Sequence, residues 1–244
     1  MVGIPYSKRQ VIMVVRLVRL KGRLYLTKRL DNPYLYDLTT QSTTELPIPP
    51  HSSANMQKVA LSYDASIVML QTLLSLAPDD SGDRSDIYQL NTANGTLVRL
   101  PEHPSHNKTL GGVTSNGSEA IYTGVGGYDS KGRRYGAKIY NFAKGSTEIA
   151  CFGDNYQSNI SSNGDWIACD TGARSDNTGA YIKNRQTGHE TQSSLTNSAI
   201  NSVTPRLGGI SNNGTLVWGI QTSTPGASYD SNNSADVFYH NFAN

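Results

Sequence analysis

Short apolar runs separated by polar turns recur along the chain with a period of about 50 residues. Four copies combine an apolar run, a turn of Asn-Gly type and a second apolar run: Val59–Leu70, Gly112–Tyr122, Asn159–Ala168 and Gly209–Trp218. Their turn residues Asp64, Asn116, Asn163 and Asn213 are 52, 47 and 50 positions apart. Asn-Gly between apolar runs is a strong hairpin signal, because a type I′ turn needs positive φ at both central residues. Each copy therefore predicts a two-stranded hairpin with a type I′ turn.

A short third strand is predicted after each hairpin. These segments are Asp86–Leu90, Lys138–Phe142, Ala180–Lys183 and Asp236–Tyr239. In the middle copies a second turn, such as Asn94-Gly95, leads to a fourth strand. The N-terminal region gives a degraded copy, with Leu20–Leu26 as the hairpin, Tyr34–Leu38 as the third strand and Thr43–Leu46 as the fourth. Five copies of four strands predict an all-β fold, a five-bladed β-propeller of four-stranded antiparallel blades.

The repeat divides residues 1–244 into one domain. The expected blades are approximately 14–50, 57–101, 109–152, 157–195 and 206–244. The last copy stops before its outer strand, and residues 2–8 precede the first hairpin without a blade of their own. We expect residues 2–8 to complete the last blade, which would close the ring and remove an exposed sheet edge. The alternative is a fragment of a longer propeller with open ends.

The Ser-x-Asn/Asp-Gly hairpin followed by Asp-Ile-Tyr resembles the WD40-like repeats of TolB-type β-propellers. The second copy carries the resemblance best, with Leu61–Val68 followed after a loop by Asp86–Asn91. Ala65 departs from the pattern because it replaces the turn glycine, and Tyr181-Ile182 inverts the Ile-Tyr order. The resemblance implies a propeller fold and three kinds of role: a protein-docking disc, a sugar binder, or a gating domain beside a hydrolase. The fold alone does not choose among them.

Composition supports strands and turns and excludes several classes of protein. Ser, Thr and Asn supply 68 of the 244 residues, with 23 Gly and 14 Tyr, whereas charged residues make up 16%. That argues against a helical bundle and a charge-rich disordered chain. A net charge of +2 is too small for a dedicated nucleic-acid binder, so we expect no nucleic-acid partner. The longest apolar stretch near the start, Val11–Val15, is too short for a membrane span or a recognisable signal peptide.

The compartment and the assembly follow from composition only as expectations. The polar, uncharged composition favours an extracytoplasmic or secreted protein, and a monomer is expected. Cys151 and Cys169 lie 18 positions apart without a CxxC pair, so a zinc site is not expected. They either form a disulfide between neighbouring strands or remain small buried residues.

Long polar loops between the second and third strands are the expected binding surface, because long loops are often functional. In blades two to five they are residues 75–85, 124–136, 170–179 and 222–234. Tyrosine and arginine in two of these loops pair flat rings with forked donors, which are enriched at binding hot spots. The expected ligand-binding residues are Tyr128, Asp129, Arg133, Arg134, Tyr135, Tyr229 and Asp230. The alternative is that these tyrosines pack over neighbouring blades.

Calcium is the one cofactor that the sequence suggests. Asp79, Asp80 and Asp83 offer hard oxygen ligands within five residues of one loop. The loop lacks the glutamate that would complete an EF-hand pattern. The alternative is that Asp, Asn, Ser and Gly only build turns, because their side chains bond the local backbone.

Catalysis has no sequence signature in this chain. No nucleophile elbow, zincin, P-loop or dinucleotide-binding motif is present. A propeller glycoside hydrolase would need carboxylates converging on the central channel, and the expected inner strands of blades two to five contain no Asp or Glu. We therefore expect a non-catalytic binding or scaffold propeller that docks a protein partner. A glycan-binding, lectin-like propeller is the alternative, and a glycoside hydrolase is the third hypothesis.

Overall fold

A computed structural model gives the fold of the chain. It describes residues 11–14, 19–20, 23–24, 34–37, 41–48, 56–78, 80, 84–101, 107–124, 135–152, 157–170, 179–194, 204–221 and 236–241. These residues form antiparallel strands and the turns between them. Within them, no helix is long and apolar enough to cross a membrane.

Three sheets in the middle of the chain have four strands each, paired in sequence order. The first contains β6 (Met56–Leu61), β7 (Ile67–Thr72), β8 (Asp86–Asn91) and β9 (Leu97–Arg99). The next contains β10 (Thr109–Val113), β11 (Glu119–Thr123), β12 (Tyr135–Asn141) and β13 (Ser146–Phe152). The third contains β14 (Ser158–Ile160), β15 (Trp166–Asp170), β16 (Gly179–Asn184) and β17 (Glu190–Ser194). All-antiparallel, four-stranded sheets are what the repeat predicts.

The sheets at the two ends of the chain have three described strands each. The C-terminal sheet contains β18 (Thr204–Ile210), β19 (Thr215–Gln221) and β20 (Asp236–Asn241). The N-terminal sheet contains β1 (Val11–Val14), β4 (Tyr34–Asp37) and β5 (Ser42–Glu45). β2 (Arg19–Leu20) and β3 (Arg23–Leu24) form a separate two-stranded hairpin.

The N-terminal sheet corrects one sequence prediction. Leu20–Leu26 was expected to supply the two inner strands beside the strand at Tyr34, but β1 occupies that place, with Val14 opposite Tyr34. The run from Val11 is apolar and follows strand propensity, whereas the segment around Leu20 is broken by basic residues. The proposed closing strand, residues 2–8, lies outside the described residues.

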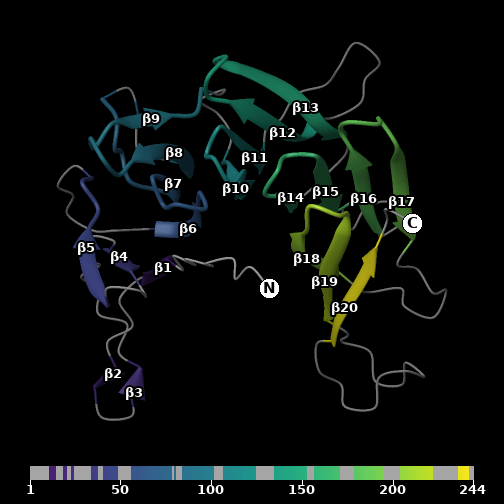
Figure 1. Cartoon of the computed structure of the whole chain (residues 1–244), viewed down its shortest axis with the longest axis horizontal. Helices are drawn as coiled ribbons and strands as arrows, with labels where there is room; N and C mark the ends of the chain where they lie inside the picture. The colour runs from purple at the N-terminus through teal and green to yellow at the C-terminus, as the bar shows by residue number, and fades with distance from the viewer. Residues whose placement is uncertain are drawn as a thin grey trace, which may run out of the picture.

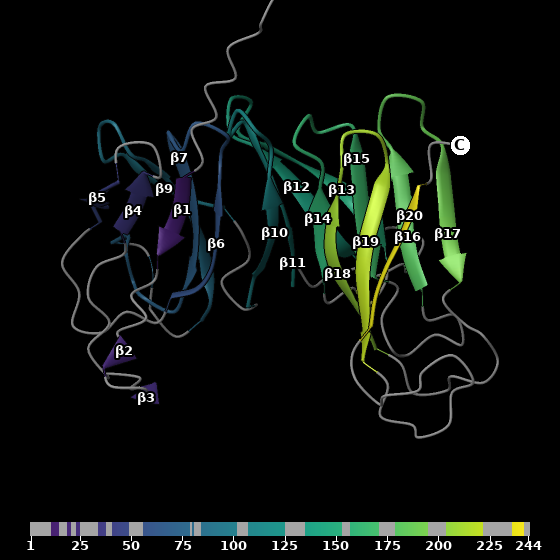
Figure 2. The same cartoon turned by 60° about the horizontal axis from the view of Figure 1, so that its bottom comes forward.

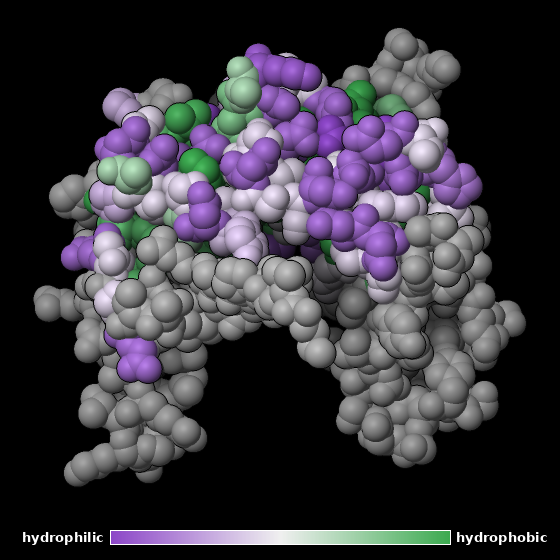
Figure 3. All heavy atoms as spheres, viewed as in Figure 1, coloured by the Kyte–Doolittle hydropathy of each residue, from purple (hydrophilic) through white to green (hydrophobic). Residues whose placement is uncertain are grey.

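The five sheets follow one another along an arc, with β1–β4–β5 at one end and β18–β19–β20 at the other (Figures 1 and 2). The first strands of successive sheets lie side by side near the centre: β6 contacts β10, β10 contacts β14, and β14 contacts β18. The fourth strands β9 and β13 lie at the periphery (Figure 1). On the face drawn in Figure 3, hydrophilic side chains cover most of the described surface. Most large apolar side chains among the described residues are buried, and Tyr63, Val98, Ile149 and Phe152 are exposed.

The core consists of clusters packed between neighbouring sheets. One joins Ile121 and Ile139 of the β10–β13 sheet to Ile160 and Ile167 of the β14–β17 sheet. Another joins Trp166 to Leu216 of the last sheet. β15 is buried along its whole length, as expected for a strand covered on both faces. Each sheet thus depends on its neighbours for stability, as in other repeat architectures.

The hairpin turns have a different geometry from the predicted type I′. In the first complete hairpin, the Ser62 backbone N–H donates to the Ile67 carbonyl, 2.9 Å away, which leaves a four-residue loop. Only the residue in the glycine position has positive φ: 56° at Ala65, 71° at Gly117, 81° at Gly164 and 76° at Gly214. The Asn or Asp before it keeps negative φ. The type I′ assignment was therefore wrong, because a four-residue loop needs one left-handed residue instead of two.

The Asn or Asp of each turn acts through its side chain. Asp64 Oδ1 accepts hydrogen bonds from the hydroxyls of Ser62 and Ser66, at 2.8 and 2.7 Å. Asn116 Oδ1 accepts the same pair of bonds from Thr114 and Ser118, at 2.9 and 2.8 Å. This local bonding satisfies the turn without the left-handed conformation, which explains why Asp and Asn are interchangeable here.

The two cysteines form a disulfide between sheets. Cys151 of β13 is bonded to Cys169 of β15. The sequence left open either a disulfide or two separate buried cysteines, and the structure has the disulfide. The bond links the outer strand of one sheet to the second strand of the next, so it crosses a boundary between repeats.

Candidate functional site

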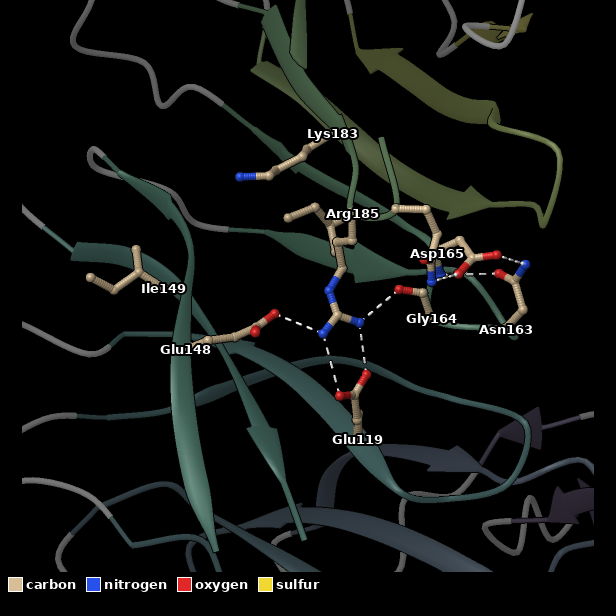
Figure 4. A pocket seen from close by; sticks show the side chains of 10 residues that line it. Glu119, Glu148, Ile149, Asn163, Gly164, Asp165, Lys183 and Arg185 are labelled. Carbon is tan, nitrogen blue, oxygen red and sulfur yellow. Dashed lines mark hydrogen bonds and ion pairs between the residues drawn. The ribbon is translucent and has the colours of Figure 1, made fainter. Parts of the chain in front are cut away.

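A cleft of about 490 Å³ lies between the sheets β10–β13 and β14–β17. Its floor comes from the turn before β15 and from the turn after β16, and β13 forms one wall (Figure 4). The cleft lies at the hairpin-turn end of the sheets, because both of these turns are at that end. The lining residues are Glu119, Glu148, Ile149, Asn163, Gly164, Asp165, Ile167, Lys183, Arg185 and Gln186.

The Arg185 guanidinium is the centre of the cleft. Its Nη1 donates to Glu119 Oε2 and to the Gly164 carbonyl, both at 2.7 Å. Its Nη2 lies 2.7 Å from Glu148 Oε1 and 3.3 Å from Glu119 Oε1 (Figure 4). Glu119 and Arg185 therefore make a bidentate pair that joins the two sheets. Paired hydrogen bonds of this kind fix orientation as well as adding energy.

The electrostatics of this pair keep both groups charged. Burial acts to raise the pKa of Glu119, but hydrogen bonds from Arg185 and Asn141 outweigh it, so the pKa lies below its usual value. Burial acts to lower the pKa of Arg185, and the hydrogen bond to Glu119 with the charges of Glu148 and Glu119 raises it instead. Neither member of the pair gains or loses a proton near neutral pH, so the pair itself is not placed to act as a general acid or base.

The rim of the cleft is more exposed. Lys183 Nζ lies 2.7 Å from Glu190 Oε1. The side chain of Glu148 is 55% exposed, and neighbouring Ile149 is 40% exposed. The rim thus has a carboxylate and an aliphatic side chain on β13 and an ammonium group on β16 of the next sheet.

A second polar cluster lies buried at the opposite end of the sheets, beside β8. Lys108 and Asp86 form a buried ion pair, and Arg99 Nη2 lies 2.7 Å from Asp86 Oδ2 and 3.7 Å from Asp80 Oδ1. The Tyr88 hydroxyl donates to Asp80 and accepts from the Leu76 backbone N–H. Two carboxylates and two cations thus compensate one another.

The pKa values in this cluster follow from that pairing. Burial acts to raise the pKa of Asp86, but hydrogen bonds from Lys108 and Arg99 hold it below its usual value. Burial and the hydrogen bond to Asp80 raise the pKa of Tyr88. A glycosidase acid would need a carboxyl with a raised pKa, and the shift at Asp86 has the opposite sign.

The structure places few of the residues expected to bind ligand. Tyr135 begins β12, where its backbone pairs with Phe152. Asp80 belongs to the buried cluster. The others lie outside the described residues: Tyr128, Asp129, Arg133, Arg134, Tyr229, Asp230, Asp79 and Asp83.

Calcium binding stays a prediction. Two of its three expected ligands are outside the described part of the chain, and the third, Asp80, is already engaged by Tyr88 and Arg99. Within the described residues, no group of three His, Cys, Asp or Glu side chains could hold a metal ion.

Sequence reasoning missed the Glu119–Arg185 pair, although the repeat contains a signal for it. Arg185 follows Asn184 as Phe142 follows Asn141 in the preceding copy, and Glu119 stands where Ile67 stands one copy earlier. Ile67 and Phe142 pack against one apolar cluster. Two apolar positions that become charged in neighbouring copies indicate an ion pair at the next boundary.

Solved structures share this arrangement of sheets. TolB from Acinetobacter baumannii matches with a TM-score of 0.53 and 18% identity, over 89% of this chain and 49% of that one. A putative TolB from Agrobacterium tumefaciens matches with a TM-score of 0.52 and 16% identity, over 77% and 62%. The chain has a TolB-like β-propeller fold. The TolB-like resemblance of the repeats is thereby confirmed at the level of fold.

A protease domain shares the TolB-like fold as well. The β-propeller domain of the Trilobed protease from Pyrococcus furiosus matches with a TM-score of 0.53 and 10% identity, over 87% of this chain and 61% of that one. The chain spans about half of the Acinetobacter TolB and less than two thirds of the other two proteins. No protein-family model and no curated protein matches it. At sequence identities of 10–18%, the similarity between this chain and the three proteins shows a shared fold and nothing more.

Proposed function

We propose that this TolB-like propeller is a non-catalytic binding module that docks a protein partner. The binding surface is the set of long loops between second and third strands, at the end of the sheets opposite the hairpin turns. The structural neighbours support the interpretation that this propeller serves as a scaffold. Loops carried by a rigid scaffold are where binding residues concentrate.

The observation that carries the proposal is the bonding between successive hairpin turns. The Tyr63 backbone N–H donates to the Ser115 carbonyl, and the Ser115 N–H donates to the Ser162 carbonyl, each at 2.7 Å. The Asn163 N–H donates to Asn212 Oδ1 at 2.9 Å. These bonds fix four sheets relative to one another at one end. This bonding supports a scaffold that is ordered before binding, and preorganisation lowers the free-energy cost of binding at the other end.

The residues proposed to contact the partner are those with rigid rings and forked donors in these loops. They are Tyr128, Asp129, Arg133, Arg134, Tyr135, Tyr229 and Asp230. Tyr and Arg are enriched among interface residues that dominate binding energy.

The complete ring is part of the same proposal. We infer five blades, with residues 2–8 supplying the outer strand of the last one, because β20 is otherwise an unpaired edge in the described sheet. The Pyrococcus propeller has an open velcro topology, which is the competing arrangement. Deletion of residues 1–8 should lower the melting temperature or cause aggregation, and an unchanged melting curve would exclude closure by this segment.

We propose an extracytoplasmic compartment, which the disulfide supports. A bond between Cys151 and Cys169 persists in an oxidising environment, which supports an extracytoplasmic protein. The propeller is proposed to act there as a monomer, which light scattering of the purified chain would establish.

The test is a paired screen of the immobilised chain against protein extract of its source and against a glycan array. A variant with Tyr128→Ala, Tyr135→Ala and Tyr229→Ala tests the loops. Tyr63→Ala is the matched control, because Tyr63 is 68% exposed on a hairpin turn at the opposite end. Capture of one protein by the wild type and the control, but not by the triple variant, is the expected result. Glycan binding with the same loss would replace the protein partner by a sugar.

A further inference from the structure

We propose that the cleft around Arg185 is a second binding site, which accepts a Lys or Arg side chain from an extended segment of a protein partner lying along β13. The site lies at the hairpin-turn end of the sheets, away from the long loops, so it is independent of the surface proposed above. The edge of β13, the charge balance of the cleft and an exposed aliphatic side chain support this site.

The edge of β13 is suited to pairing with an added strand. β13 is the last strand of its sheet, with β12 as its strand neighbour among the described residues, and it lies at the periphery in Figure 1. It is seven residues long, whereas the corresponding β9 has three. The side chains from Ser146 to Ile149 are exposed. A long edge of this kind presents backbone donors and acceptors to an extended peptide.

The charges beside that edge favour a cation. Four carboxylates, from Glu119, Glu148, Asp165 and Glu190, lie in or at the rim of the cleft, with two cations, Lys183 and Arg185. Glu119 neutralises Arg185, and Glu190 is paired with Lys183. Glu148 also contacts Arg185, and Asp165 accepts hydrogen bonds from the neutral side chains of Asn163 and Gln186. Lys144 also acts on Glu119 through its charge, so the groups in and around the cleft carry one negative charge in excess.

Arg185 itself has no capacity for an anionic ligand at its two amino groups. Its two terminal nitrogens already donate to two carboxylates and the Gly164 carbonyl. In contrast, Glu148 uses Oε1 for Arg185, and its side chain is 55% exposed at the mouth of the cleft (Figure 4). A guanidinium or ammonium group entering along β13 would meet this carboxylate first.

An aliphatic surface completes the site. Ile149 follows Glu148 on β13, lines the cleft and is 40% exposed. Its side chain and that of Glu148 leave β13 on opposite sides (Figure 4), so Ile149 would contact a neighbouring apolar residue of the added peptide. The edge of β13, the Glu148 carboxylate and the Ile149 side chain together match an extended peptide that carries one basic residue.

The test is an NMR titration of the ¹⁵N-labelled full chain with a capped heptapeptide of alternating Thr and Val with a central Arg. The same peptide with central citrulline, which is neutral and of similar shape, is the control ligand. We expect saturable shifts of the amides of Glu148, Ile149 and Gly164 with the Arg peptide and at least about threefold weaker binding of the citrulline peptide.

Variants separate this site from the loop surface. Glu148→Gln should weaken the Arg peptide at least about threefold, and Glu45→Gln, an exposed acid in the N-terminal sheet, should not. The triple tyrosine variant should bind the peptide normally. Equal binding of the Arg and citrulline peptides, or equal binding to Glu148→Gln and wild type in a spectrum that shows a folded chain, would overturn the proposal.

Discussion

The backbone N–H of Ser115 donates to the carbonyl oxygen of Ser162, 2.7 Å away, and so joins the hairpin turns of two neighbouring sheets. The residues occupy the same place in their turns, one position before the Asn. Tyr63 stands in that place one copy earlier and donates to Ser115 at the same distance. In these three copies the repeat thus fixes both the fold of the hairpin and its contact with the neighbouring one.

Turn glycines contribute to this contact through close packing, which predicts a position-dependent cost of adding a methyl group. A Cβ at Gly117 would lie 2.5 Å from Ile67 Cγ1 of the preceding sheet, whereas a Cβ at Gly188 would meet nothing within 4 Å. Both residues have φ of +71°. Both alanine variants should lose about 1–2 kcal/mol to backbone strain, and Gly117→Ala should lose about 1–3 kcal/mol more to overpacking.

Chemical denaturation of the Gly117→Ala and Gly188→Ala variants measures that difference. Because φ is the same at both positions, the extra loss reports the contact between sheets. Equal free energies of unfolding would show that the turn of β10–β11 is not packed on Ile67.

The disulfide should contribute to stability across a sheet boundary. It closes a segment with a sequence separation of 18, for which loop entropy predicts about 3 kcal/mol. Replacing Cys151 and Cys169 together by Ala should lower the melting temperature by about 6–12 °C. Calorimetry in oxidising buffer measures the loss, and treatment of the wild type with a reductant should reproduce it. A melting temperature insensitive to both would mean that the thiols are not joined in solution.

The buried cluster beside β8 predicts acid sensitivity. The folded-state pKa of Asp86 lies below its unfolded value, so its stabilisation is complete above about pH 4 and is lost as pH falls through the folded-state pKa. Asp86→Asn would leave the buried Lys108 without its partner and should cost about 3–5 kcal/mol at pH 7.

Urea denaturation at pH 7 and at lower pH tests this account of Asp86. The stability gap between wild type and Asp86→Asn should narrow as the pH falls below about 4. The Glu45→Gln variant serves as the control for loss of an exposed acid. A gap that stays constant with pH would contradict the ion pair.

The Glu119–Arg185 pair should be exchangeable for the apolar residues found at the preceding boundary. Arg185→Phe alone leaves Glu119 partly buried without its cation, and Glu119→Ile alone deprives Arg185 of a bidentate partner. Ion pairs replaced as a whole by apolar residues often cost nothing, whereas single removals are destabilising. The double variant should therefore be more stable than the sum of the single losses predicts, by about 0.5–3 kcal/mol. Additive losses in the double-mutant cycle would refute the equivalence of the two boundaries.

The repeat made the sheets predictable from the sequence, because hairpin signals at a regular spacing determine which strands are neighbours. Ala65 illustrates this: it stands in the glycine position of its turn and has a φ of 56°, which alanine rarely adopts. The turn type was not predictable, because Asn-Gly fits more than one loop length. The N-terminal sheet was assigned wrongly because its copy retains too few of the repeat's residues to position β1.

The candidate site was harder to predict, because its residues are brought together by the packing of separate repeats. Glu119 and Arg185 are 66 positions apart and belong to different sheets. Only an alignment of the copies, with Ile67 and Phe142 at the corresponding places, would have pointed to them. Asp80 shows a different limit of sequence reasoning. The sequence identified it as an acidic residue in a loop, but its contact with Arg99, the last residue of β9, is visible only in the structure.

The most direct test of the binding proposal is the dissociation constant of the captured protein for three forms of the chain. Interface hot-spot residues cost about 2 kcal/mol or more each when truncated, so the Tyr128→Ala, Tyr135→Ala, Tyr229→Ala variant should bind at least about 30-fold more weakly than wild type. Tyr63→Ala should bind as wild type does. An unchanged dissociation constant for the triple variant, or a loss confined to Tyr63→Ala, would contradict docking through the long loops.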